Sequence, residues 1–113
     1  MHCTEARRQV VDYCRQLAAS PLASGMSGNI SCLDRESGLM AISPSAMDYG
    51  EMDIEDVVLV DRDGNLVDPG RRPSSEWAMH LGCYRLRETV GAVVHTHSIA
   101  ATTLAVLGRE LPA

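Results

Sequence analysis

The chain has 113 residues, 45% of them apolar, and its 10 basic and 15 acidic side chains give a net charge of −5. This length suits one domain with a single hydrophobic core, and the acidic balance argues against a nucleic-acid binder, which presents a basic stripe to phosphates. We find no secretory signal, no apolar run near the roughly 18 residues that span a bilayer and no CxxC pair, which predicts a soluble, reduced, cytoplasmic protein without a membrane partner.

The first half of the chain predicts one helix followed by short strands. Residues 4–19 place apolar side chains at helical spacing, with Thr4 as the expected N-cap. A turn-rich loop follows over residues 24–29. Short apolar segments then predict strands at 29–33, 39–43, 57–61 and 65–67. An Asp-Gly-Asn turn between the last two of these segments suggests a hairpin.

The second half predicts a helix, a strand and a further helix. A helix is expected over residues 74–88, directly after a proline. The apolar run 92–94 predicts a buried strand that ends in a His-x-His pattern, and a third helix begins at about Ser98. The order α-β-β-β-β-α-β-α indicates the α/β class. Several strands follow one another without a helix between them, which argues against a doubly wound parallel sheet.

The pattern His95-Thr96-His97 is the sharpest indication of chemistry. Side chains alternate along a strand, so residues i and i+2 point to the same face, with backbones about 6–7 Å apart. Two such imidazoles could converge on one zinc ion at bonds of roughly 2.0–2.1 Å. The alternative is a pair of histidines that hydrogen-bond within a loop. The apolar strand before them favours the metal site, because open α/β sheets tend to carry their sites at strand ends.

A second candidate is Ser74-Ser75-Glu76, at the predicted start of the helix. Serine hydroxyls beside unpaired backbone N–H groups suit a phosphate, and Glu76 is expected in the first helical turn. Ordinary capping explains the same residues, with serine as the N-cap and glutamate favoured by the helix dipole. The choice between these two interpretations stays open on this segment alone.

Two further segments are candidates for ligand contact. Gly28-Asn29 and the Ser-Pro-Ser-Ala stretch at 43–46 offer close backbone approach and neutral hydrogen-bond donors. For either segment alone, turn chemistry is the simpler interpretation. His80, one turn beyond Glu76, could be a metal ligand, although a hydrogen-bonded helix residue is the simpler interpretation.

In this order, these segments resemble the class II aldolase/adducin family. Residues 28–31 are similar to the family's G-N-[VI]-S segment, and residues 42–46 to its I-[TS]-P-[ST]-G loop. Residues 73–80 match P-S-S-E-x-x-x-H, and residues 93–97 match V-V-H-x-H. The resemblance extends over nearly the whole chain from residue 4. We therefore expect residues 1–113 to be the N-terminal portion of a single domain of this family.

The resemblance implies a three-layer αβα sandwich with a mainly antiparallel central sheet. It also implies a Zn²⁺ site at His95, His97 and Glu76, in which Glu76 is the catalytic acid/base. The substrate and phosphate site would comprise Gly28, Asn29, Ser45, Ala46, Ser74 and Ser75. The chain departs from the family pattern at Ala46, where Gly is usual, and at Met26, where Thr is common. A third zinc histidine and a catalytic tyrosine belong to the C-terminal half of the family domain.

By the same resemblance, the whole protein would be a carbon–carbon lyase and a homo-oligomer, a tetramer. It would cleave a small phosphorylated ketose similar to L-fuculose 1-phosphate into dihydroxyacetone phosphate and an aldehyde, through an enediolate, and residues 1–113 alone would be inactive. The alternatives are a sugar-phosphate epimerase or dehydratase of the same family, or a non-catalytic adducin-like module. The resembling epimerases usually carry Asp at the position of Glu76, which favours the aldolase. A complete set of Glu76, His95 and His97 argues against the module.

Overall fold

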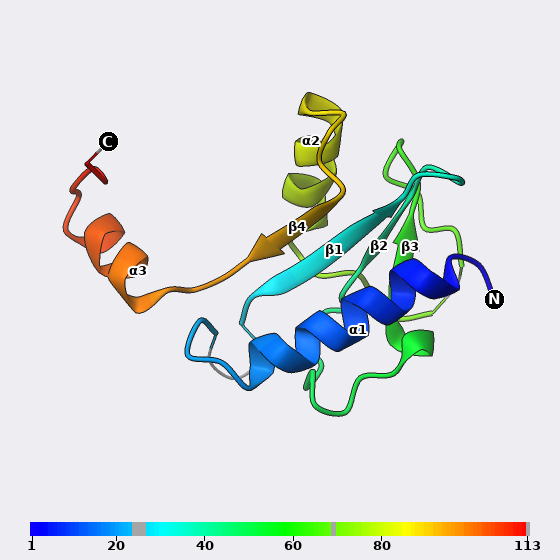
Figure 1. Ribbon diagram of the computed structural model, residues 1–113, viewed down its shortest axis with the longest axis horizontal. Coiled ribbons are helices and arrows are strands. Elements are labelled where there is room, and N and C mark those ends of the chain that lie inside the picture. The colour runs from blue at the N-terminus through cyan, green and yellow to red at the C-terminus, as the bar shows by residue number, and fades with distance from the viewer. Residues whose placement is uncertain (24–26, 69, 113) are drawn as a thin grey trace.

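The computed structural model describes residues 1–23, 27–68 and 70–112 (Figure 1). In chain order the elements are α1 (Thr4–Ala18), β1 (Asn29–Asp34), β2 (Leu39–Ile42), the 3₁₀ helix η1 (Ile54–Asp56), β3 (Val58–Val60), α2 (Trp77–Leu86), β4 (Ala92–His95) and α3 (Ile99–Val106). The strands of the described chain form one sheet in the order β3-β2-β1-β4, and each neighbouring pair is antiparallel. This confirms the predicted α/β class and antiparallel sheet. No helix within the described ranges is long and apolar enough to cross a membrane.

The two faces of the sheet bury different side chains, because successive residues of a strand point to opposite faces. Ala41 and Leu59 belong to the core that packs against α1. Their neighbours Met40 and Val60 belong to the core that packs against α2. Figure 1 shows α1 lying across the face of β1 and β2. Helices thus cover both faces of the sheet, and the expected three-layer αβα arrangement is confirmed.

The start of α1 differs from the prediction. Cys3 occupies the N-cap position in a left-handed conformation, with φ at 56°, and makes no capping hydrogen bond from its side chain. The hydroxyl of Thr4 donates to the Met1 carbonyl at 3.3 Å instead of capping the helix. The prediction of Thr4 as the N-cap is therefore wrong, because Thr4 already lies inside the first turn.

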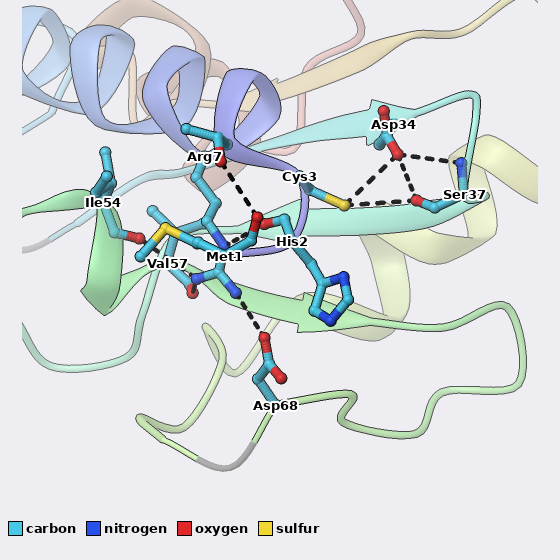
Figure 2. A network of polar contacts seen from close by, with 10 residues as sticks. Met1, His2, Cys3, Arg7, Asp34, Ser37, Ile54, Val57 and Asp68 are labelled. Atoms are coloured by element: carbon cyan, nitrogen blue, oxygen red, sulfur yellow. Dashed lines mark hydrogen bonds and ion pairs between the residues drawn. The ribbon is translucent and has the colours of Figure 1, made fainter.

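A buried arginine holds the first turn of α1 against the rest of the molecule. The guanidinium of Arg7, 4% exposed, donates to the carbonyls of His2 at 2.8 Å and Val57 at 2.6 Å. It also pairs with the Asp68 carboxylate at 2.9 Å. Figure 2 shows Arg7 extending from α1 towards these partners. A buried charge is tolerated when its donors are satisfied in this way, and the contacts join α1 to the approach to β3.

The helix predicted over 74–88 begins at Trp77, with Glu76 at its N-cap position. The backbone N–H of Ser74 donates to the Ser43 carbonyl at 2.9 Å, so the residues before Trp77 pair with the loop after β2. Glu76 therefore precedes the helix, and the expectation that it lies in the first helical turn is wrong. The pairing brings the Ser74–Glu76 segment beside the loop that follows β2.

Two of the predicted strands also need correction. β4 pairs only with β1 among the described strands, and the Val94 side chain is 57% exposed, so β4 is an edge strand and not the buried strand expected. The segment 65–67 forms a single bridge, between Leu66 and Val60, and is not a named strand. The suggested hairpin does form, since the Val67 N–H donates to the Leu59 carbonyl at 3.0 Å. The third helix begins after Ser98 as predicted.

Candidate active site

One end of the sheet collects the segments that the sequence singles out. Asn29, at the start of β1, pairs with His95, at the end of β4, and the end of β2 pairs with the same part of β1. Because these neighbours are antiparallel, the start of β1 and the ends of β2 and β4 lie at the same end of the sheet. The Ser74–Glu76 segment joins them through its contact with the loop after β2.

These segments line an open cavity of about 240 Å³. It is lined by Ser27, Gly28, Asn29, Pro44, Ser45, Ala46, Tyr49, Ser74, Ser75, Glu76 and His97. All six predicted substrate residues, Glu76 and His97 thus border one space, while His95 contacts Glu76 from beside it. The loop predicted over 24–29 is described only from Ser27, so Met26 and its departure from the family pattern lie outside the described residues.

The backbone at the cavity explains the glycine of the first segment. Gly28 has φ at +82°, and a Cβ there would lie 3.0 Å from both the His95 carbonyl oxygen and a methyl carbon of Leu17. The Tyr49 hydroxyl, which the sequence analysis missed, donates to the Gly28 carbonyl at 2.6 Å. Ala46 also lies in the left-handed region, with φ at 53°, where the resembling family has Gly. The family's preference at that position therefore has a conformational reason.

The Glu76 carboxylate lies between an amide and an imidazole. The side-chain N–H of Asn29 donates to Glu76 Oε2 at 2.8 Å, and His95 Nδ1 contacts the same oxygen. The hydrogen bond from Asn29 lowers the pKa of the Glu76 carboxyl, and the adjacent His95 and His97 lower it further, against a smaller opposing effect of burial. Glu76 is therefore an ionised acceptor at neutral pH.

The two histidines of the His-x-His pattern lie next to each other. Their ring centroids are 5.0 Å apart with planes tilted by 57°. His95 Nδ1 is buried and has no aligned hydrogen-bond partner, although it touches Glu76. Two imidazoles and a carboxylate are donor types that zinc prefers. Across residues 1–23, 27–68 and 70–112, however, no three His, Cys, Asp or Glu side chains are already arranged to hold a metal ion.

His80 is buried behind the site, and both of its ring nitrogens are occupied. Nδ1 lies 2.7 Å from the Ser31 hydroxyl, and Nε2 contacts the Asn29 carboxamide oxygen. Burial, together with the nearby His95, lowers the pKa of His80 to about 4. His80 is therefore the hydrogen-bonded helix residue of the simpler interpretation and not a metal ligand in this structure.

The sequence analysis missed Ser31 and Tyr84, whose hydroxyls lie 2.7 Å apart in the same buried cluster. The spacing of both residues in the sequence could have indicated that they lie near Asn29 and His80. Ser31 follows Asn29 by two residues on β1 and so points to the same face of the sheet. Tyr84 follows His80 by four residues on α2 and so lies on the same side of that helix.

Known proteins resemble this chain over nearly its whole length. It is 50% identical over 107 residues to a 5-deoxy-D-ribulose 1-phosphate aldolase of Bacillus thuringiensis serovar kurstaki, a match that covers 95% of this chain and 50% of that protein. It is 44% identical over 107 residues to an L-ribulose-5-phosphate 4-epimerase of Salmonella paratyphi C, covering 95% and 47%. A solved L-fuculose 1-phosphate aldolase matches with a TM-score of 0.92 and 42% identity, over 100% of this chain and 53% of that one.

The chain therefore spans about half the length of the curated relatives that it matches. The solved aldolase has the same fold over these residues, with the antiparallel sheet between helices. The family model described as Class II Aldolase and Adducin N-terminal domain matches residues 8–113. Both the structural and the family match extend through all the segments that line the cavity, and the chain thus belongs to the class II aldolase and adducin N-terminal domain family.

Proposed function

We propose that the natural protein containing this chain is a zinc-dependent aldolase that cleaves a ketose 1-phosphate into dihydroxyacetone phosphate and an aldehyde. Residues 1–113 are then the N-terminal portion of one aldolase domain. The observation that carries the proposal is the shared cavity, in which serine side chains and an ionised carboxylate next to two imidazoles border one space of about 240 Å³. A phosphorylated ketose needs both halves of such a site.

The serine side of the cavity suits a phosphate. Ser45, Ser74 and Ser75 line it, and no described residue in its lining is Lys or Arg. Serine hydroxyls are therefore the donors available to an anion. The backbone N–H groups of Ser74, Glu76 and Trp77 already donate within the protein. Holding the phosphate there fixes the reacting carbons beside Glu76, which supplies the gain in rate that positioning provides.

The carboxylate side suits proton transfer next to a carbonyl. Breaking the carbon–carbon bond leaves an enediolate, in which the negative charge is shared between the reacting carbon and the former carbonyl oxygen. A zinc ion held by His95 and His97 would supply Lewis-acid stabilisation of that charge. Glu76 then moves the proton at the neighbouring carbon, removing it in the synthetic direction and returning it on cleavage. The resemblance assigns the third histidine ligand and the proton donor for the aldehyde to the other half of the family domain.

The second candidate is a sugar-phosphate 4-epimerase, because one relative with that name is 44% identical to this chain. Two observations favour the aldolase. The identity to a ketose 1-phosphate aldolase is higher, at 50% over the same number of residues. The acid/base position is Glu76, where the resembling epimerases usually carry Asp.

The deciding assay uses the natural protein loaded with Zn²⁺. We expect 5-deoxy-D-ribulose 1-phosphate or L-fuculose 1-phosphate to release dihydroxyacetone phosphate, which a coupled reductase detects. L-Ribulose 5-phosphate is the matched test for the second candidate. Its conversion to an epimer, with no dihydroxyacetone phosphate from either 1-phosphate, would replace the aldolase proposal by the epimerase.

The proposal extends to assembly and location. The natural protein would be a cytoplasmic homotetramer with sites near its subunit boundaries, as the resemblance implies. Light scattering on the zinc-loaded protein measures the mass directly. A fully active monomer would contradict this part of the proposal and leave the chemistry intact.

A further inference from the structure

A series of hydrogen-bonded polar side chains connects α2, through β1, to Glu76. The Tyr84 hydroxyl lies 2.7 Å from Ser31 Oγ, which lies 2.7 Å from His80 Nδ1. On the other side of the ring, Nε2 contacts Asn29 Oδ1, and Asn29 Nδ2 donates to Glu76 at 2.8 Å. Ser31 and His80 are 0% exposed, Asn29 7% and Tyr84 9%. Water therefore does not easily replace the contacts among these four residues.

One arrangement of protons satisfies every member. A carboxylate only accepts, so the NH₂ of Asn29 faces Glu76 and its oxygen faces His80. Nε2 of His80 must then carry a proton. The ring is buried between neutral groups, which favours the uncharged form, so Nδ1 is an acceptor for the Ser31 hydroxyl. Ser31 in turn accepts a hydrogen bond from Tyr84, so every donor in this series points towards Glu76 or towards the ring.

This arrangement fixes the side chain that holds the carboxylate. An asparagine carboxamide that rotates by half a turn exchanges its oxygen and nitrogen. In the rotated state the Asn29 oxygen would face the Glu76 carboxylate, and its NH₂ would face the N–H of His80, so both contacts would become repulsive. The Glu76 carboxylate and the N–H of His80 therefore both favour the orientation in which Asn29 donates to Glu76.

We propose that His80 is a positioning residue, which acts through Asn29 to hold Glu76 in its working orientation, with the proton of its neutral ring on Nε2. The catalytic consequence rests on the proposed function, because Glu76 must act in turnover for its orientation to matter. The proton arrangement rests on the contacts alone. The two parts can therefore be tested separately.

The tautomer is measured by nitrogen NMR of the natural protein labelled at histidine. We expect His80 to be neutral, with its proton on Nε2, near neutral pH. A proton on Nδ1, or on both nitrogens, would overturn the proposed arrangement. This measurement needs no substrate, so it tests the proposed proton arrangement even if the protein cleaves none of the tested sugars.

A pair of amide variants tests the catalytic consequence. The amide nitrogen of Gln lies near the position of Nε2, whereas the shorter Asn reaches only the position of Nδ1. We expect His80→Asn to lower kcat about 10–100-fold, the usual cost of losing a supporting partner behind an active-site group. His80→Gln should recover most of that loss, and KM should change little in either variant.

Leu81→Ala is the matched control, since Leu81 is the next residue of α2, is 4% exposed and lies in the core between α2 and the sheet. We expect it to lower Tm while leaving kcat unchanged. Equal kcat losses in His80→Gln and His80→Asn, or wild-type kcat in His80→Asn, would overturn the positioning role. An inactive wild-type protein would instead count against the proposed aldolase function.

Discussion

Asn29, Ser74 and His80, on one side of the site, are each less than a tenth exposed. His97, on the other side, is exposed, and α3 after it contains no buried residue. Asn29 and His80 belong to β1 and α2, two elements that contribute residues to the cores on the sheet, whereas β4 pairs with one strand among those described. Figure 1 shows α3 well away from the sheet. The groups behind the carboxylate are thus held by buried contacts, whereas the Glu76 side chain itself is 41% exposed. His95, whose side chain is 26% exposed, is held by the pairing of β4 with β1.

Replacing a residue of each side should separate the two contributions to catalysis. We expect His95→Ala to lose bound metal and activity together, because the imidazole is a proposed zinc ligand and alanine offers no donor in its place. Metal content measured on the purified natural protein, beside dihydroxyacetone phosphate release, checks this. A variant that keeps a full equivalent of zinc would show that His95 is not a ligand.

The complementary variant on the carboxylate side is Glu76→Gln. Gln keeps the size and an oxygen but cannot take a proton, so we expect zinc to stay bound while kcat falls about 10²–10⁴-fold. The same two assays measure both quantities. Wild-type turnover in Glu76→Gln would remove this glutamate from the mechanism.

Stability should show the same division between the two regions. Leu59 is 0% exposed in the core against α1, and Val106 in α3 is 82% exposed. We expect Leu59→Ala to lower the free energy of unfolding by about 2–5 kcal/mol, and Val106→Ala to change it by less than about 0.5 kcal/mol. Urea denaturation of the natural protein gives both values. A large cost at Val106 would mean that α3 is packed in that protein and would weaken the comparison.

The two left-handed positions at the cavity make a smaller, sharper test. Gly28→Ala should lower the free energy of unfolding by about 1–3 kcal/mol, because the new Cβ would meet the His95 backbone oxygen at 3.0 Å. Ala46→Gly should raise it by about 0.5 kcal/mol. Glycine relieves the roughly 1–2 kcal/mol cost of the left-handed conformation but loses about 0.5–1 kcal/mol through its freer unfolded chain. Thermal and urea denaturation check both, and a stabilised Gly28→Ala would contradict the crowding at β4.

The smallest effect concerns the approach to the serine segment, where Arg71 pairs with Asp56 at 2.5 Å. Burial would raise the pKa of the Asp56 carboxyl, but the Asp53 backbone N–H and Arg71 together lower it. A lowered folded pKa stabilises the protein above the unfolded value, about 3.9, and this stabilisation is lost as pH falls through the folded pKa. We expect Asp56→Asn to cost about 0.2–1 kcal/mol at neutral pH and nothing in strong acid. An equal cost at both pH values would exclude the ionised pair as its source.

The sequence by itself determined the elements that depend on near neighbours. Apolar spacing defines residues 4–19 as a helix almost to the residue, because one helical face must be apolar to pack. Alternating and short apolar runs likewise identify β1, β2 and β3 to within one or two residues. The candidate site residues were also evident as short motifs, because each motif is contiguous in the chain.

Only the tertiary structure decided how those motifs meet and which side chains support them. Asn29 and Glu76 are 47 positions apart, and Ser31 and Tyr84 are 53 apart. Such contacts depend on strand register and on the placement of α2, which no local pattern encodes. The same reason accounts for the errors. Ser74 pairs with the loop after β2, and α2 begins only at Trp77. The burial of β4 was wrongly predicted because an apolar run does not indicate whether its strand has a neighbour on both sides.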